Sequence, residues 1–85
     1  MTLTDEQREA LNTQIADRRK ILSDEIASGN KNKYRIDNMK YQVVKLAAFR
    51  DGLWEEFTER YESAEQNIIE TFARENGIDL MGVRQ

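Results

Sequence analysis

Apolar side chains recur at helical spacing along one long stretch of the chain, from Ile36 to Phe72. When each residue is advanced by about 100° around a helix axis, they stay within one sector from beginning to end. The stripe consists of Ile36, Met39, Val43, Leu46, Ala47, Leu53, Trp54, Phe57, Tyr61, Ala64, Ile68 and Phe72. Because a turn has no reason to preserve this phase, the pattern predicts one long helix over residues 35–76, about 60 Å in length.

The weakest point of this predicted helix is Asp51–Gly52. Glycine inside a helix costs only about 1 kcal/mol relative to alanine, so an unbroken helix can contain it. The alternative is that Asp51 or Gly52 caps a further helix, which would give a three-helix bundle with a break at Asp51–Gly52. Both the unbroken helix and the three-helix bundle are possible interpretations, and the shared apolar phase favours the unbroken helix.

A shorter helix is predicted over residues 5–28. Thr4 and Gln7 have the spacing of a capping box at its start, and Gly29 is placed to end it in a left-handed conformation. At the other end of the chain, Asn76 and Gly77 read as a helix stop, with Ile78 placed to make the apolar contact of a Schellman motif. The 85 residues then form a single small helical domain. Its irregular parts are an N-terminal cap region (1–4), a basic loop (29–34) and a C-terminal tail (77–85).

The composition argues against catalysis. The chain has no cysteine and no histidine, so it lacks thiolate ligands and the commonest general base and metal ligand. Serines have no imidazole to activate them, and the acidic residues fall on faces expected to be exposed. We therefore expect no enzyme activity, no cofactor and no metal. No segment is long and apolar enough for a membrane span, and the N-terminus lacks a signal-peptide pattern, so a cytoplasmic protein or a component of a viral particle is expected.

The long helix is expected to need a partner. A helical hairpin of one short and one long helix leaves the C-terminal aromatic residues of the stripe uncovered, and monomers rarely expose such large apolar patches. Tyr41, Val44, Ala48 and Gly52 form a second face on which another backbone can approach closely. The predicted partner interface consists of Tyr41, Val44, Ala48, Gly52, Trp54, Phe57, Tyr61, Ile68 and Phe72. The sequence thus predicts a coiled-coil-like interaction protein, as a homo-oligomer or a subunit of a larger assembly. Small acidic helical chains of this kind also occur among virus-encoded proteins, although no motif links this chain to a family.

Two arginines, Arg18 and Arg50, fall within the predicted apolar faces. A buried guanidinium requires a carboxylate or carbonyl partner, and the candidates are Asp17, Asp24 or Glu25 in an antiparallel hairpin, or acids from another chain. Either these arginines extend past the edge of the core to water, or they fix the register of the helices. The sequence does not separate the two readings.

Charge is divided along the predicted long helix, and this division supports two alternative functions. Its basic start interleaves cations with aromatic rings, which is the pattern of a nucleic-acid contact: Lys31, Lys33, Tyr34, Arg35 and Lys40. Its later half carries an acidic face made of Glu55, Glu59, Glu62 and Glu70, which would suit an inhibitor that occupies a basic site on a target protein. The net charge of −3 argues against general nucleic-acid binding, so the protein–protein reading is preferred.

Overall fold

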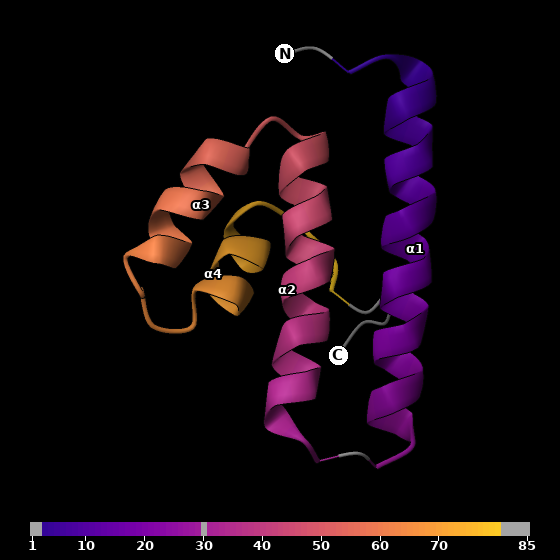
Figure 1. Cartoon of the computed structure of the whole chain (residues 1–85), viewed down its shortest axis with the longest axis vertical. Helices are drawn as coiled ribbons and strands as arrows, with labels where there is room; N and C mark the ends of the chain where they lie inside the picture. The colour runs from indigo at the N-terminus through magenta and orange to yellow at the C-terminus, as the bar shows by residue number, and fades with distance from the viewer. Residues whose placement is uncertain (1–2, 30, 81–85) are drawn as a thin grey trace.

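The chain forms four helices in a computed structural model that describes residues 3–29 and 31–80. The helices are α1 (Asp5–Ala27), α2 (Lys33–Arg50), α3 (Trp54–Glu62) and α4 (Ile68–Glu75). Figure 1 shows α1 and α2 side by side as an antiparallel pair, with α3 and α4 on the side of α2 that faces away from α1. The central helix α2 packs against each of the other three. The predicted all-helical class is confirmed, and no strand occurs in the described ranges.

The first helix follows its sequence signals closely. The Thr4 hydroxyl accepts a hydrogen bond from the Gln7 backbone N–H at 3.1 Å, and the Gln7 side chain accepts one from the Thr4 backbone N–H at 2.9 Å. This is the predicted capping box. The helix ends at Ala27, and Gly29 adopts a φ of +82°, as a left-handed cap requires. The prediction for residues 5–28 is confirmed to within one residue.

The prediction of one helix over 35–76 is wrong, because the chain turns at Asp51–Gly52. Gly52 has a φ of +75°, and two backbone hydrogen bonds close the turn: Leu53 N–H to Ala48 C=O at 2.8 Å and Gly52 N–H to Phe49 C=O at 3.3 Å. These bonds form a Schellman motif, which ends α2 at Arg50. Leu53 then packs against the core, so an apolar residue after the turn continues the apolar stripe. The common phase on both sides of Gly52 therefore did not require an unbroken helix.

A second break separates α3 from α4. Ala64 and Asn67 both adopt left-handed backbone conformations, with φ of 60° and 56°. The Ala64 and Glu65 backbone N–H groups donate to the carbonyls of Tyr61 and Arg60, the same pattern as at Gly52. The three-helix alternative was therefore right about the break at Asp51–Gly52 but missed this one. A third motif of this kind, with Ile78 N–H donating to Ala73 C=O at 2.8 Å, confirms the helix stop predicted at Gly77.

The hydrophobic core lies where α2, α3 and α4 meet, and one residue of α1 joins it. The buried cluster consists of Ile15, Val43, Val44, Ala47, Ala48, Phe57, Ile68, Phe72, Ala73 and Ile78. The Phe57 and Phe72 rings are in contact, with centroids 5.0 Å apart, which joins α3 to α4. The chain thus covers much of its own apolar stripe by folding α3 and α4 back onto α2.

Substitutions at two of the left-handed turn residues, Gly52 and Ala64, should shift stability in opposite directions. In Gly52→Ala the added Cβ meets no atom within 4 Å, so the cost is the backbone strain alone. We expect that strain to lower the free energy of unfolding by about 1 kcal/mol. Ala64→Gly removes the same kind of strain and should raise the free energy of unfolding by about 0.5–1 kcal/mol. Urea denaturation followed by circular dichroism measures both, and a shift of the two variants in the same direction would contradict this description of the turns.

The described part of the C-terminal tail folds back on the helices. Ile78 is buried and Leu80 packs against the core, while the Arg19 Nε group donates a hydrogen bond to the Asp79 backbone carbonyl. Residues 81–85 of the predicted tail, together with residues 1–2 of the cap region and Asn30 of the basic loop, lie outside the described residues. Within the described ranges, no helix combines the length and the apolar character needed to cross a membrane.

Candidate partner-binding surface

Two pairs of aromatic rings lie where α3 packs against α2, and we call their four residues the aromatic surface: Tyr41 with Tyr61, and Phe49 with Trp54. Tyr41 and Phe49 belong to α2, whereas Trp54 and Tyr61 belong to α3. The reversal at Gly52 brings the Tyr41 and Tyr61 rings to a centroid distance of 4.8 Å. The Phe49 and Trp54 rings are in edge-to-face contact, with a centroid distance of 6.4 Å and an angle of 74° between the ring planes. The surface therefore depends on the turn that ends α2.

The aromatic surface is open to solvent. Phe49 is 45% exposed and Tyr61 is 43% exposed, while Tyr41 and Trp54 are half-buried. Two hollows meet at Trp54. The aromatic groove, of about 350 Å³, is lined by Tyr41, Lys45, Trp54, Phe57, Thr58, Tyr61 and Glu62. The other hollow, of about 220 Å³, is lined by Leu3, Phe49, Gly52, Trp54 and Glu55.

A single cation lies in the aromatic groove. The Lys45 Nζ atom is 5.9 Å from the centroid of the Tyr41 ring and 5.9 Å from that of the Trp54 ring. Both distances fall within the range of cation–π attraction. Lys45 follows Tyr41 by one helical turn on α2, so its side chain reaches Tyr41 along the same face and Trp54 across the interface with α3.

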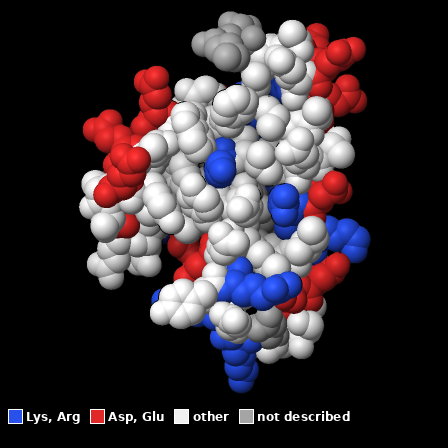
Figure 2. All heavy atoms as spheres, in the orientation of Figure 1, with Lys and Arg blue, Asp and Glu red and all other residues white. Residues whose placement is uncertain are grey.

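Carboxylates border the aromatic surface along α3. Glu55, Glu56, Glu59 and Glu62 are exposed, and among the described residues none of the four forms an ion pair. Figure 2 shows acidic groups gathered over the side of the molecule where α3 lies, next to a largely uncharged area. Of the acidic face predicted from the sequence, only Glu70 is neutralised, by Lys40 at 3.2 Å.

Of the nine residues predicted for the partner interface, three contribute to the aromatic surface, namely Tyr41, Trp54 and Tyr61. Gly52 is exposed at the turn. The remaining five are buried within the chain: Val44, Ala48, Phe57, Ile68 and Phe72. All five belong to the core cluster in which α2, α3 and α4 meet, so the surface open to a partner is narrower than the sequence predicted. Phe49 and Lys45 were not among the predicted residues.

The two arginines singled out in the sequence differ in their surroundings. Arg50 holds the Asp51 carboxylate with two hydrogen bonds, at 2.9 and 3.1 Å, and donates a third to the Asn12 side chain of α1 at 2.9 Å. The hydrogen bond to Asp51 raises the pKa of Arg50 above its usual value. Its partners are thus Asp51 and Asn12 rather than the predicted Asp17, Asp24 or Glu25. Arg18 is exposed, which fits the interpretation that its side chain extends past the edge of the core to water.

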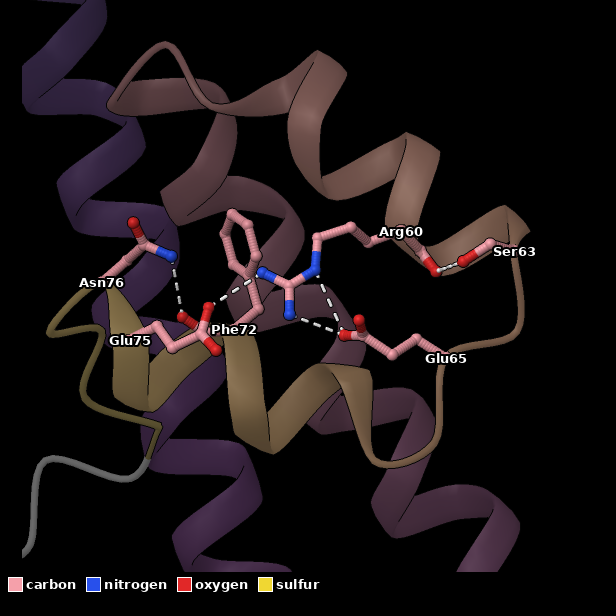
Figure 3. Close-up of polar contacts among 6 residues, drawn as sticks. All are labelled: Arg60, Ser63, Glu65, Phe72, Glu75 and Asn76. Atoms are coloured by element: carbon pink, nitrogen blue, oxygen red, sulfur yellow. Dashed lines mark hydrogen bonds and ion pairs between the residues drawn. The ribbon is translucent and has the colours of Figure 1, made fainter.

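Arg60 is a structural residue that sequence reasoning missed. Figure 3 shows its guanidinium between two carboxylates, with Nη2 2.6 Å from Glu65 Oε2 and Nη1 2.8 Å from Glu75 Oε1. The guanidinium carbon also lies 5.8 Å from the centre of the Phe72 ring. Arg60 therefore joins α3 to the following linker and to the end of α4. From the sequence, Arg60 was noted only as the one basic residue in the acidic segment 51–70.

The contact with Arg60 shifts the pKa of Glu75, which can be measured. Hydrogen bonding to Arg60 lowers the pKa of Glu75 below its ordinary value of 4.5, while the two carboxylates raise the pKa of Arg60. Because the folded-state pKa of Glu75 is depressed, its stabilising contribution is present above pH 4.5 and is lost as the pH falls through the folded-state pKa. In Arg60→Met, the pKa of Glu75 should rise towards 4.5 in an NMR titration. Arg74→Met, which removes only a more distant charge, should raise it less; an equal rise would contradict the assignment.

The predicted basic segment is partly neutralised. Arg35 pairs with Glu25, and Lys40 pairs with Glu70. Lys31, Lys33 and Tyr34 are exposed. A groove of about 520 Å³ between the start of α2 and the start of α4 has a mixed lining of Lys31, Lys33, Ile36, Asp37, Lys40, Glu65, Asn67, Ile68, Ile69 and Glu70. The structure thus brings cations and carboxylates together in this groove.

The described residues contain no cluster of three or more acidic side chains arranged to hold a metal ion. Comparison of the chain with protein-family models, with curated proteins and with solved structures found no match. The class that the fold and the surface define is therefore a small four-helix domain with an exposed aromatic surface bordered by acids.

Proposed function

We propose that the protein is a non-enzymatic helical interaction protein that binds a partner protein through its aromatic surface. The observation that carries this proposal is the joint exposure of Phe49 and Tyr61 beside the half-buried Tyr41 and Trp54. Large aromatic side chains supply most of the binding energy at protein interfaces, particularly when they line a concave surface. The partner is either a second copy of the chain or another subunit of an assembly, and its contact with the groove would cover these rings.

The two alternative functions are supported unequally. The nucleic-acid alternative loses support because Arg35 and Lys40 are paired with acids of the same chain, which leaves fewer cations for phosphates. The acidic-inhibitor alternative gains support, because the carboxylates of α3 are exposed beside the aromatic surface. It is compatible with the proposal, since both place the contact on α3.

Site-specific photo-crosslinking tests the proposal. A benzoylphenylalanine is introduced at Phe49, at Tyr61 or, as a control, at Tyr34, and the protein is irradiated alone and in an extract of its native cells. Tyr34 is 87% exposed and lies at the start of α2, about two helical turns before Tyr41, and it lines neither of the two hollows at Trp54. We expect the same discrete adduct from positions 49 and 61 and none from position 34. Equal labelling from all three positions, or no adduct from any, would contradict the proposal.

A further inference from the structure

We propose that the aromatic groove binds a cationic side chain, lysine or arginine, presented by a basic segment of the partner protein. The Lys45 side chain occupies the position of that cation until the partner displaces it. This inference rests on the proposed function and adds the chemical class of the partner to it.

The arrangement of the rings supports a cationic ligand. Tyr41 and Trp54 already hold an ammonium group between them, since Lys45 Nζ lies at the same distance, 5.9 Å, from both centroids. Tyr61 stands 4.8 Å from Tyr41, and Phe57 forms a buried wall. Several aromatic faces around one cation are the usual means by which proteins recognise ammonium groups. The groove therefore has the chemistry of a cation site, and the Lys45 ammonium group already lies near two of its rings.

The charges around the groove favour a basic partner. Glu62 lines the groove, and Glu55, Glu56 and Glu59 follow along α3 without an ion-pair partner among the described residues. Several bases elsewhere, in contrast, are neutralised within the chain, as Arg35, Lys40, Arg50 and Arg60 are. A basic segment would thus meet unpaired carboxylates along α3, which steers association and fixes orientation.

Lys45 can leave the groove at little cost. Within the described ranges it forms no ion pair, and its ammonium group lies near the two rings alone at cation–π distance. An exposed cation–π contact is weak, and the flexible lysine stem allows the ammonium to move into solvent. Removing its charge should then favour a cationic ligand, because a competing occupant and a like charge disappear together.

Trp54 provides the readout, because it is the chain's only tryptophan and it lines the groove. The protein is titrated with a short amphipathic helical peptide of leucine and lysine, and separately with the same pattern of leucine and glutamate. We expect a saturable change in Trp54 fluorescence with the lysine peptide and none with the glutamate peptide. Stronger binding of the glutamate peptide would overturn the proposal.

Three variants locate the binding. Lys45→Met should tighten binding of the lysine peptide by about three- to tenfold. Glu62→Gln, which changes an exposed side chain and leaves the core intact, should weaken it by about two- to threefold. Tyr34→Ala, the control, should leave it unchanged. Weaker binding of the lysine peptide by Lys45→Met would mean that Lys45 does not compete with a cationic ligand for the groove, and would overturn the proposal.

The alternative occupant of the groove that must be tested is a second copy of the chain. Light scattering should show the 10.0 kDa monomer at the concentrations used for titration. A dimer that Tyr61→Ala returns to monomer would assign the groove to self-association and overturn the cationic ligand. Photo-crosslinking at Tyr61 would still give an adduct in that case, so the failure of this inference is distinguishable from the failure of the proposed function.

Discussion

Replacing Phe57 by alanine is expected to lower the free energy of unfolding by about 3–5 kcal/mol. Phe57 is 1% exposed, and its ring contacts those of Tyr41, Tyr61 and Phe72 at centroid distances of 5.9, 5.8 and 5.0 Å. The substitution therefore removes ring contacts with α2, with α4 and within α3 itself, and leaves a cavity. Small domains are stable by only about 5–15 kcal/mol, so this loss takes a large part of the total.

Phe49→Ala is the matched control for this prediction, because it removes the same ring from an exposed position. Phe49 is 45% exposed, so we expect its loss to change the free energy of unfolding by less than about 1 kcal/mol. Urea denaturation followed by circular dichroism compares the two variants. Similar destabilisation by both would mean that α3 does not pack on the core as described.

Leu22→Ala should have the second-largest effect, a loss of about 2–5 kcal/mol. Helix α1 buries only two side chains completely, Ile15 and Leu22, and Leu22 is 0% exposed. The neighbouring Ile21 is 47% exposed, so Ile21→Ala removes an aliphatic side chain of the same size from an exposed position at a cost of less than about 1 kcal/mol.

The same denaturation experiment separates these two α1 variants. A large loss of unfolding free energy in Leu22→Ala with a small loss in Ile21→Ala would confirm that α1 packs through the face that contains Leu22. The reverse order would mean that α1 is rotated about its axis or does not pack on α2.

The ends of the helices were predictable where the sequence carried a local chemical signal. The Thr4–Gln7 capping box and the stop at Asn76–Gly77–Ile78 were both read correctly. Asp51–Gly52–Leu53 carries the same pattern, an Asx residue, a glycine and an apolar residue, yet it was read as part of a helix. The continuity of the apolar stripe outweighed the local signal. That continuity also arises when the apolar residue after a Schellman turn packs inward, as Leu53 does.

The break after Glu62 had a weaker signal. Ala64 and Asn67 adopt positive φ angles, which alanine rarely does. Because this segment contains no glycine, its sequence does not predict a turn in the way that Gly52 does. Ala64 also continued the apolar phase and was therefore assigned to the stripe. Only the polar run from Glu65 to Asn67 indicated an interruption.

The site could be predicted in its residue types but not in its extent. Trp54 and Tyr61 were expected at an interface because a single long helix would leave them uncovered, and Tyr41 because it falls on the second face of that helix. Phe57 and Phe72 were expected there for the same reason, but α3 and α4 fold back and bury both. Lys45 was read only as one of several bases, although its spacing of one turn from Tyr41 is a signal for a cation–π contact. Which aromatic residues stay exposed depends on the tertiary fold, and a periodic pattern does not contain that information.

The contact between Tyr41 and Tyr61 is the most direct test, because the aromatic surface exists only if α3 folds back along α2. The structure places the two ring centroids 4.8 Å apart. An unbroken helix would separate the two residues by about 30 Å. A two-dimensional NMR experiment that detects through-space contacts between ring protons should show strong cross-peaks between Tyr41 and Tyr61, and further cross-peaks from each to Phe57. Absence of the Tyr41–Tyr61 cross-peaks, with helical contacts continuing through Gly52, would contradict both the fold and the binding surface.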